Sequence, residues 1–136
     1  MTKKTKRVAL FSALSAKVAA GELVVVDEIK LEAYKTSEMV KMLAALGCQK
    51  EVTKTYKVTT VTDGEVVKEK KTRTATVAQK ALVVLPEADK VVVKSFANIP
   101  GVETTLYSTI NVYEVLKAEK VVMTKAAIEK LEEVYA

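Results

Sequence analysis

Basic side chains are the most abundant chemically active groups in this 136-residue sequence. It has 22 lysine and arginine residues against 17 acidic ones, for a net charge of +5. Such side chains neutralise phosphate groups, so the composition mildly favours a polyanionic partner. The segment 49–79 holds seven basic and four acidic residues and contributes +3 of the total. Four more basic residues open the chain: Lys3, Lys4, Lys6 and Arg7.

Enzyme chemistry has few candidates in this sequence. The absence of histidine removes the commonest general base and the commonest metal ligand. The single cysteine, Cys48, cannot form an internal disulfide and has no histidine to activate it, so we interpret it as a small packing residue. The four glycines are too far apart in sequence to build a contiguous phosphate-binding loop.

Asp27 and Glu28 form the one acidic pair in a position that enzymes use. They follow a predicted strand, and α/β enzymes bind their ligands at the carboxyl ends of strands. An acidic pair there also suits a loop or a helix cap. We expect no catalytic residue, no metal and no cofactor.

The elements that must position the basic residues follow from the apolar pattern. Residues 81–85 are continuously apolar, which predicts a strand covered on both faces. Similar segments recur at 23–27, 102–107 and 120–124, and helix-like stretches lie between them. This order predicts an α/β fold with a parallel sheet sandwiched by helices.

The first helix is expected over residues 5–20. Val8, Phe11, Leu14 and Val18 recur there at helical spacing, and basic residues crowd the N-terminal end, where the helix dipole disfavours cations. An external anion would relieve that conflict, and a frayed, solvated tail is the alternative. The stretch is similar to the start of a signal peptide, but Ser12, Ser15 and Lys17 interrupt it, so we favour an amphipathic helix. No apolar run is long enough to span a bilayer.

Four further helices are expected. Thr36 or Ser37 should cap the second helix, and helices are expected at 90–97 and from Asn111 to about residue 117. Thr124 should cap the last helix. Its expected inward stripe is Ile128, Leu131, Val134 and Tyr135.

Residues 50–78 are predicted to form a protruding β-hairpin. Asp63-Gly64 lies between β-prone runs, which is typical of a type I′ turn. This turn sets Lys57 opposite Lys70 and Tyr56 opposite Lys71. The hairpin could be a polyanion-binding finger with Tyr56 available for stacking, or a solvated insertion whose lysines prevent edge aggregation. Its candidate RNA-binding residues are Lys54, Lys57, Lys68, Lys70, Lys71 and Arg73.

Six stretches, in order, resemble the L-four family of large-subunit ribosomal proteins. They are Lys6–Ser15, Gly21–Asp27, Lys35-Thr36, Asn98–Val102, Asn111–Tyr113 and Val121–Ala127. The resemblance implies one domain over residues 1–136, in three α/β/α layers with a four-stranded parallel sheet. Residues 82–85 and 121–123 should lie in its interior strands. It also implies a cytoplasmic, structural constituent of the large ribosomal subunit, with no membrane partner. Such a protein binds large-subunit rRNA beside neighbouring ribosomal proteins. By match or by position, its candidate RNA contacts in this part of the sequence are Lys3, Lys4, Lys6, Arg7, Lys35 and Thr36.

The sequence also departs from the family pattern. Family members are longer and carry an N-terminal segment and a tunnel loop that this sequence lacks, so a second chain could supply that half. The hairpin is outside the usual pattern, and Phe11 and Phe96-Ala97 stand where the family usually has arginine-containing motifs. These departures leave an alternative open, namely a paralogous or engineered protein-interaction module on the same scaffold.

Overall fold

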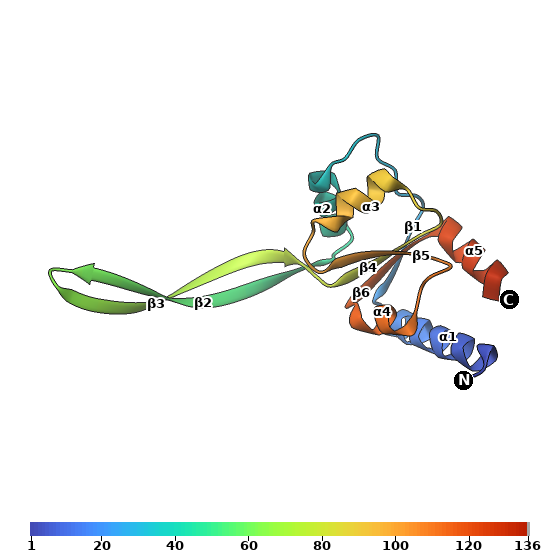
Figure 1. The fold of residues 1–136 in the computed structure, drawn as a ribbon, viewed down its shortest axis with the longest axis horizontal. Helices are drawn as coiled ribbons and strands as arrows, with labels where there is room; N and C mark the ends of the chain where they lie inside the picture. Colours follow the sequence, from blue (N-terminus) through green and yellow to red (C-terminus); the bar gives the residue numbers. More distant parts are fainter. Residues whose placement is uncertain (136) are drawn as a thin grey trace.

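The computed structural model describes residues 1–135, which form a body of helices and strands and one long hairpin that projects from it (Figure 1). The strands of the body are β1 (Leu23–Val26), β4 (Ala81–Leu85), β5 (Val102–Leu106) and β6 (Lys120–Thr124). Its helices are α1 (Lys3–Ala19), α2 (Thr36–Ala45), α3 (Lys90–Ala97), α4 (Val112–Lys117) and α5 (Lys125–Tyr135). The hairpin consists of β2 (Gln49–Thr62) and β3 (Glu65–Ala78).

The four body strands form one parallel sheet in the order β1-β6-β4-β5. The expected interior strands, β4 and β6, are confirmed. All five residues of β4 are buried, and so are residues 121–124 of β6. Continuous burial of this kind explains why these strands have no polar alternation in sequence.

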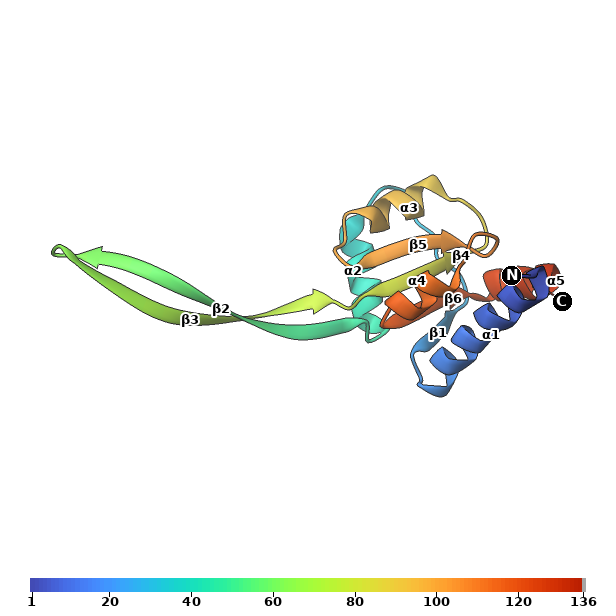
Figure 2. The same cartoon turned by 60° about the horizontal axis from the view of Figure 1, so that its bottom comes forward.

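Two separate cores cover the faces of the sheet. Val83 and Val122 point into the core beneath α2 and α3, together with Phe96. Val84 and Val121 point into the opposite core, beneath α1, α4 and α5. Figures 1 and 2 show these helices on the two sides of the sheet, so the predicted α/β/α layering is confirmed.

The buried stripe of α1 differs from the expected one. Leu10 and Ala13 are buried, while Val8 and Val18 are exposed. The stripe that faces the body continues to Lys17, whose Nζ donates to the backbone oxygen of Ala118 at 2.7 Å. A lysine can bury its aliphatic stem and still satisfy its charge. Because the buried face of α1 includes a lysine, the spacing of the apolar residues did not predict it.

Smaller corrections concern the helix ends and α5. The N-cap of α2 is Lys35, without a side-chain cap, and not Thr36 or Ser37. Val134 is exposed, because the inward face of α5 is built by Ala127 and Leu131. The predicted caps at Asn111 and Thr124 are confirmed, since their side chains accept from the backbone N–H groups three residues later.

The hairpin has the predicted register. Val61 pairs with Val66, Lys57 with Lys70 and Tyr56 with Lys71. Asp63 and Gly64 have φ angles of +50° and +83°, and a type I′ turn requires positive φ at both central residues. Figure 2 shows the twisted two-stranded ribbon extending well beyond the body. No helix within residues 1–135 is both long enough and apolar enough to cross a membrane.

Candidate nucleic-acid interface

The hairpin presents a group of six exposed cationic side chains. They are Lys54, Lys57, Lys68, Lys70, Lys71 and Arg73. Within residues 1–135 none of the six forms an ion pair, although the hairpin also carries acidic residues. The register explains this, because no carboxylate is opposite any of the six: Lys57 faces Lys70, Lys54 faces Arg73, Lys68 faces Thr59 and Lys71 faces Tyr56. Like charges placed directly opposite one another repel, and a bound anion would relieve that repulsion.

Several cations of the body are neutralised, whereas others, including Lys3, Lys4 and Lys6, form no ion pair within the described residues. Lys17, Lys117, Lys125 and Lys130 each form an ion pair with a carboxylate. The one hairpin lysine that does so is Lys50, at its base, whose Nζ is 2.6 Å from Glu119 Oε1. The unneutralised charge of the hairpin is therefore concentrated in its projecting part.

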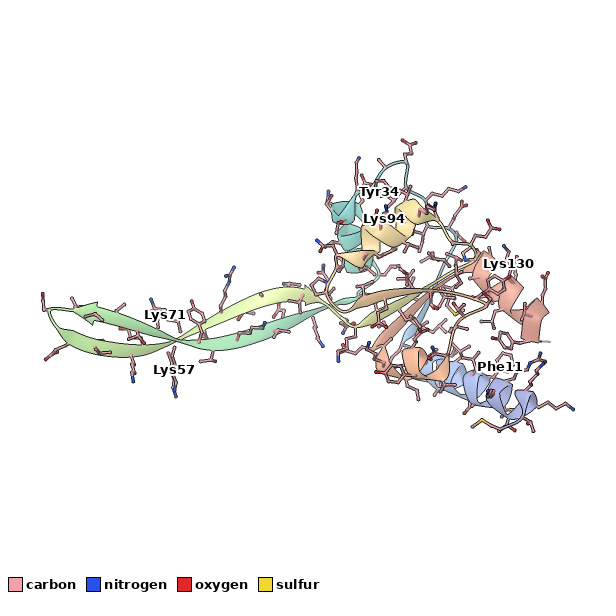
Figure 3. All side chains as sticks on the ribbon, viewed as in Figure 1. Phe11, Tyr34, Lys57, Lys71, Lys94 and Lys130 are labelled. Carbon is pink, nitrogen blue, oxygen red and sulfur yellow. The ribbon has the colours of Figure 1, made fainter. Side chains whose placement is uncertain are left out.

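The two faces of the hairpin differ chemically. Because alternate residues of a strand share a face, Tyr56 lies with Lys54, Lys71 and Arg73, whereas Lys57, Lys68 and Lys70 lie on the other face among threonines. Figure 3 labels Lys57 and Lys71 on the ribbon. One face thus combines cations with an exposed aromatic ring, and the other offers cations and hydroxyl groups.

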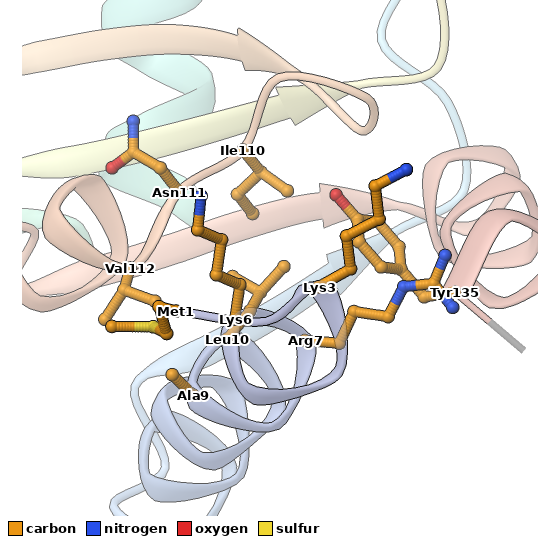
Figure 4. Close-up of a pocket in the computed structure, with 10 residues that line it drawn as sticks. All are labelled: Met1, Lys3, Lys6, Arg7, Ala9, Leu10, Ile110, Asn111, Val112 and Tyr135. Carbon is orange, nitrogen blue, oxygen red and sulfur yellow. The ribbon is translucent and has the colours of Figure 1, made fainter.

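The basic residues at the start of the chain lie within α1 and not in a tail before it. Thr2 caps the helix, its Oγ1 accepting from Thr5 N at 3.3 Å. The guanidinium of Arg7 lies 5.7 Å from the ring centroid of Tyr135, so this cation already packs against α5. Figure 4 shows Lys3, Lys6 and Arg7 around a groove of about 620 Å³ that also touches Ile110.

Lys35 and Thr36 are less available than the hairpin cations. Lys35 Nζ is 3.1 Å from Glu38 Oε1, and its backbone N–H donates to Ser95 Oγ. Thr36 is half-buried in the first turn of α2. The lysine is therefore partly neutralised and serves to join α2 to α3.

The twelve candidate residues do not form one continuous surface. Figure 1 shows the hairpin projecting from one side of the body and the N-terminus of α1 on the opposite side, with the start of α2 elsewhere. The six hairpin cations are the one large group that the fold brings together. A large RNA is the kind of partner that could contact several groups at once.

The acidic residues at the carboxyl edge of the sheet are ion-paired. Asp27 and Glu87 line a cleft of about 380 Å³. Asp27 pairs with Lys125 and Glu87 with Lys130. The hydrogen bond and the charge of each lysine lower the pKa of its carboxyl partner, so both acids favour the ionised form. A general acid needs the opposite shift.

Cys48 and the two phenylalanines have different environments. Cys48 is fully buried, and burial raises the pKa of its thiol, as expected for a packing residue. Phe96 is fully buried in the core beneath α3, so it is a core residue. Phe11 is 38% exposed and packs edge-on against Tyr135 at a centroid distance of 5.9 Å.

Sequence reasoning missed one part of the surface, a cleft of about 530 Å³ at the base of the hairpin. Lys50, Lys54 and Lys80 line it, together with Val40 of α2 and the turn at Pro100. These residues come from four separate segments, and no local pattern signals that they meet. The only local hint was the cation density of segment 49–80.

Comparison with known proteins identifies the family. A family model described as the ribosomal protein L4/L1 family matches residues 1–134. Curated relatives include the large ribosomal subunit protein uL4 of Alkaliphilus oremlandii, 42% identical over 134 residues, which are 98% of this chain and 51% of the relative. The uL4 proteins of Alkaliphilus metalliredigens and Agathobacter rectalis are 39% and 40% identical over 136 residues, all of this chain and 52% of each relative.

The chain thus spans about half the length of the curated relatives it matches. Together with the parallel sheet and its two helical layers, these matches show that the chain belongs to the ribosomal protein L4/L1 family.

Proposed function

We propose that this protein is a structural component of the large ribosomal subunit, in the cytoplasm, and that it binds large-subunit rRNA with its hairpin. Its role is to neutralise and position RNA phosphates and not to catalyse a reaction. Membership of a family whose curated members are named large ribosomal subunit proteins supports the proposal. The observation that carries it is the group of six exposed hairpin cations without ion pairs within residues 1–135.

The physical argument is one of charge and reach. When an unpaired lysine binds a phosphate, it releases counterions from the RNA, and this release favours binding. An ion-paired lysine contributes little to RNA binding, because its carboxylate partner must first be displaced. The projecting ribbon also lets both of its faces approach RNA while the body stays outside. The other candidate residues, Lys3, Lys4, Lys6, Arg7, Lys35 and Thr36, are proposed as secondary contacts.

The test compares two variants of equal net charge. In the hairpin variant Lys57, Lys68 and Lys70 are changed to glutamine; in the control Lys30, Lys90 and Lys94 of the body are changed to glutamine. All six side chains are exposed. Binding to large-subunit rRNA is measured by fluorescence anisotropy at low salt. We expect the hairpin variant to bind at least roughly tenfold more weakly than the control. Equal losses in both variants would contradict a hairpin-centred interface.

The proposal includes neighbouring ribosomal proteins as partners. It also includes a second polypeptide, which supplies the half of the relatives that this chain does not match. The groove beside α1 supports such a partner, because Leu10, Ile110 and Val112 form an apolar floor between basic side chains. Co-expression of this chain with the unmatched part of the Alkaliphilus oremlandii protein tests it. Joint elution from a size-exclusion column is the expected result, and separate elution would contradict this part of the proposal.

A further inference from the structure

The cleft at the base of the hairpin and the Tyr56 face form one continuous surface. The cleft of about 530 Å³ has aliphatic walls from Val40, Val52, Val77 and Pro100. Its cationic groups include Lys54 and Lys80, neither of which forms an ion pair within the described residues. Such a site combines a surface for an apolar or aromatic group with charges for an anion.

The register connects this cleft to Tyr56. Lys54 and Tyr56 are two residues apart on β2 and therefore lie on the same face, about 7 Å apart along the strand. Arg73 is opposite Lys54, and Lys71 is opposite Tyr56. A ligand that leaves the cleft along this face therefore meets the tyrosine ring with cations on both strands.

Within the described residues, the ring of Tyr56 has no cation packed on it, unlike the rings of the other tyrosines. Tyr34, Tyr107, Tyr113 and Tyr135 each have a lysine or arginine within 6 Å of the ring centroid. Tyr56 is 47% exposed and has no such cation in the part of the chain that the structure describes. The exposed part of this ring is therefore not occupied by a neighbouring cation and is accessible to another planar group.

We propose that this surface binds an unpaired stretch of RNA, with one base stacked on Tyr56 and a neighbouring nucleotide in the cleft. Lys54, Lys71, Lys80 and Arg73 contact the phosphates. An aromatic ring beside cations is the arrangement that binds single strands, because a base within a duplex has no free face to stack. The inference rests on the proposed function and specifies the kind of RNA that this face recognises.

The test uses the full chain, a short oligoadenylate RNA and a blunt RNA duplex of the same length. Stacking on an aromatic side chain is worth about 1–3 kcal/mol per base, so Tyr56→Ala should weaken oligoadenylate binding roughly tenfold or more. Tyr56→Phe should retain binding because it keeps the ring. The control Tyr113→Ala removes a body tyrosine that is 71% exposed and should change nothing. Duplex binding should be the same for all of these variants.

A second pair of variants tests the cleft. Lys80→Gln should weaken oligoadenylate binding several-fold, because one phosphate contact is lost. Lys90→Gln removes an equal charge at the start of α3, which does not line the cleft, and should have little effect. Far-ultraviolet circular dichroism of each variant establishes that the fold is retained.

Several results would overturn this inference, and they separate it from the proposed function. If Tyr56→Ala binds oligoadenylate as tightly as the unchanged protein while the hairpin lysine variant still loses rRNA, only the single-strand site is wrong. If polyglutamate binds with the same dependence on Tyr56, the surface recognises acidic peptides and not RNA. If neither the oligoadenylate nor the large-subunit rRNA binds at low salt, both proposals fail.

Discussion

At the scale of single residues, the lysines of this protein fall into two electrostatic classes. Lys117, Lys125 and Lys130 have raised pKa values, each because a hydrogen bond and the charge of a carboxylate stabilise the cation. Apart from Lys50 at the base of the hairpin, the hairpin lysines have no such partner within residues 1–135, and some face another cation. This difference was not predictable from composition, since both classes have the same side chain and it is the fold that decides which lysine meets a carboxylate.

The two phenylalanines should differ in their contribution to stability. Phe96→Ala is expected to lower the free energy of unfolding by about 3–5 kcal/mol, because it leaves a cavity in the core beneath α3. Phe11→Ala should cost far less, about 0.5–1.5 kcal/mol, since Phe11 is half-exposed and loses mainly its contact with Tyr135. Urea denaturation measures both. Equal losses would show that Phe11 is more deeply packed than the structure has it.

The ion pair between Asp27 and Lys125 gives a prediction about pH. Because Lys125 lowers the pKa of Asp27 in the folded protein, this carboxylate stabilises the fold above the pKa that it has when unfolded. That contribution is lost as the pH falls through the lower folded value. Asp27→Asn should therefore lower the melting temperature slightly at pH 7, and its difference from the unchanged protein should shrink as the pH falls below about 4.

Thermal denaturation across this pH range measures the effect, with Glu32→Gln as the control. Glu32 is exposed and has no ion pair among the described residues. A difference for Asp27→Asn that stays constant down to the lowest pH would show that the ion pair is not its origin.

At the scale of elements, the sequence predicted the strands better than the helix faces. The uninterrupted apolar run 81–85 could only be a strand covered on both sides, and Asp63-Gly64 fixed the register of the hairpin through its turn. The face of α1 could not be predicted, because two stripes share the helical spacing and the buried one includes Lys17. The cleft at the hairpin base was also unpredictable, since four distant segments build it.

The hairpin should be removable without unfolding the body. Gln49 pairs with Ala78, so a short glycine link can replace residues 50–77. No residue of that segment is among the buried members of either core, and the main polar loss is the half-exposed ion pair between Lys50 and Glu119. We expect the melting temperature to change little and rRNA affinity to fall strongly. A protein that no longer unfolds cooperatively would show that the hairpin stabilises the body.

At the scale of the whole molecule, the fold separates stability from charge. The three-layer body holds both cores and forms most of the ion pairs, while the ribbon carries cations outward (Figure 1).

With no histidine in the chain, no side chain is expected to change its charge between pH 6 and pH 8. RNA binding should therefore be nearly constant across that interval and depend on salt instead. An affinity that changed strongly over this interval would point to a titrating group that the hairpin model does not contain.

The most direct test of the central claim is the salt dependence of rRNA affinity, measured for the full chain and for the protein without residues 50–77. If unneutralised hairpin lysines and Arg73 bind phosphates, the affinity of the full chain should fall steeply as salt rises. The deletion removes the six unpaired cations together with the ion-paired Lys50. Each phosphate contact contributes about 0.7–0.9 to the logarithmic slope, so loss of the six unpaired cations should flatten the slope by up to about 4 or 5. Equal slopes for the two proteins, or an affinity of the full chain that does not respond to salt, would contradict the account.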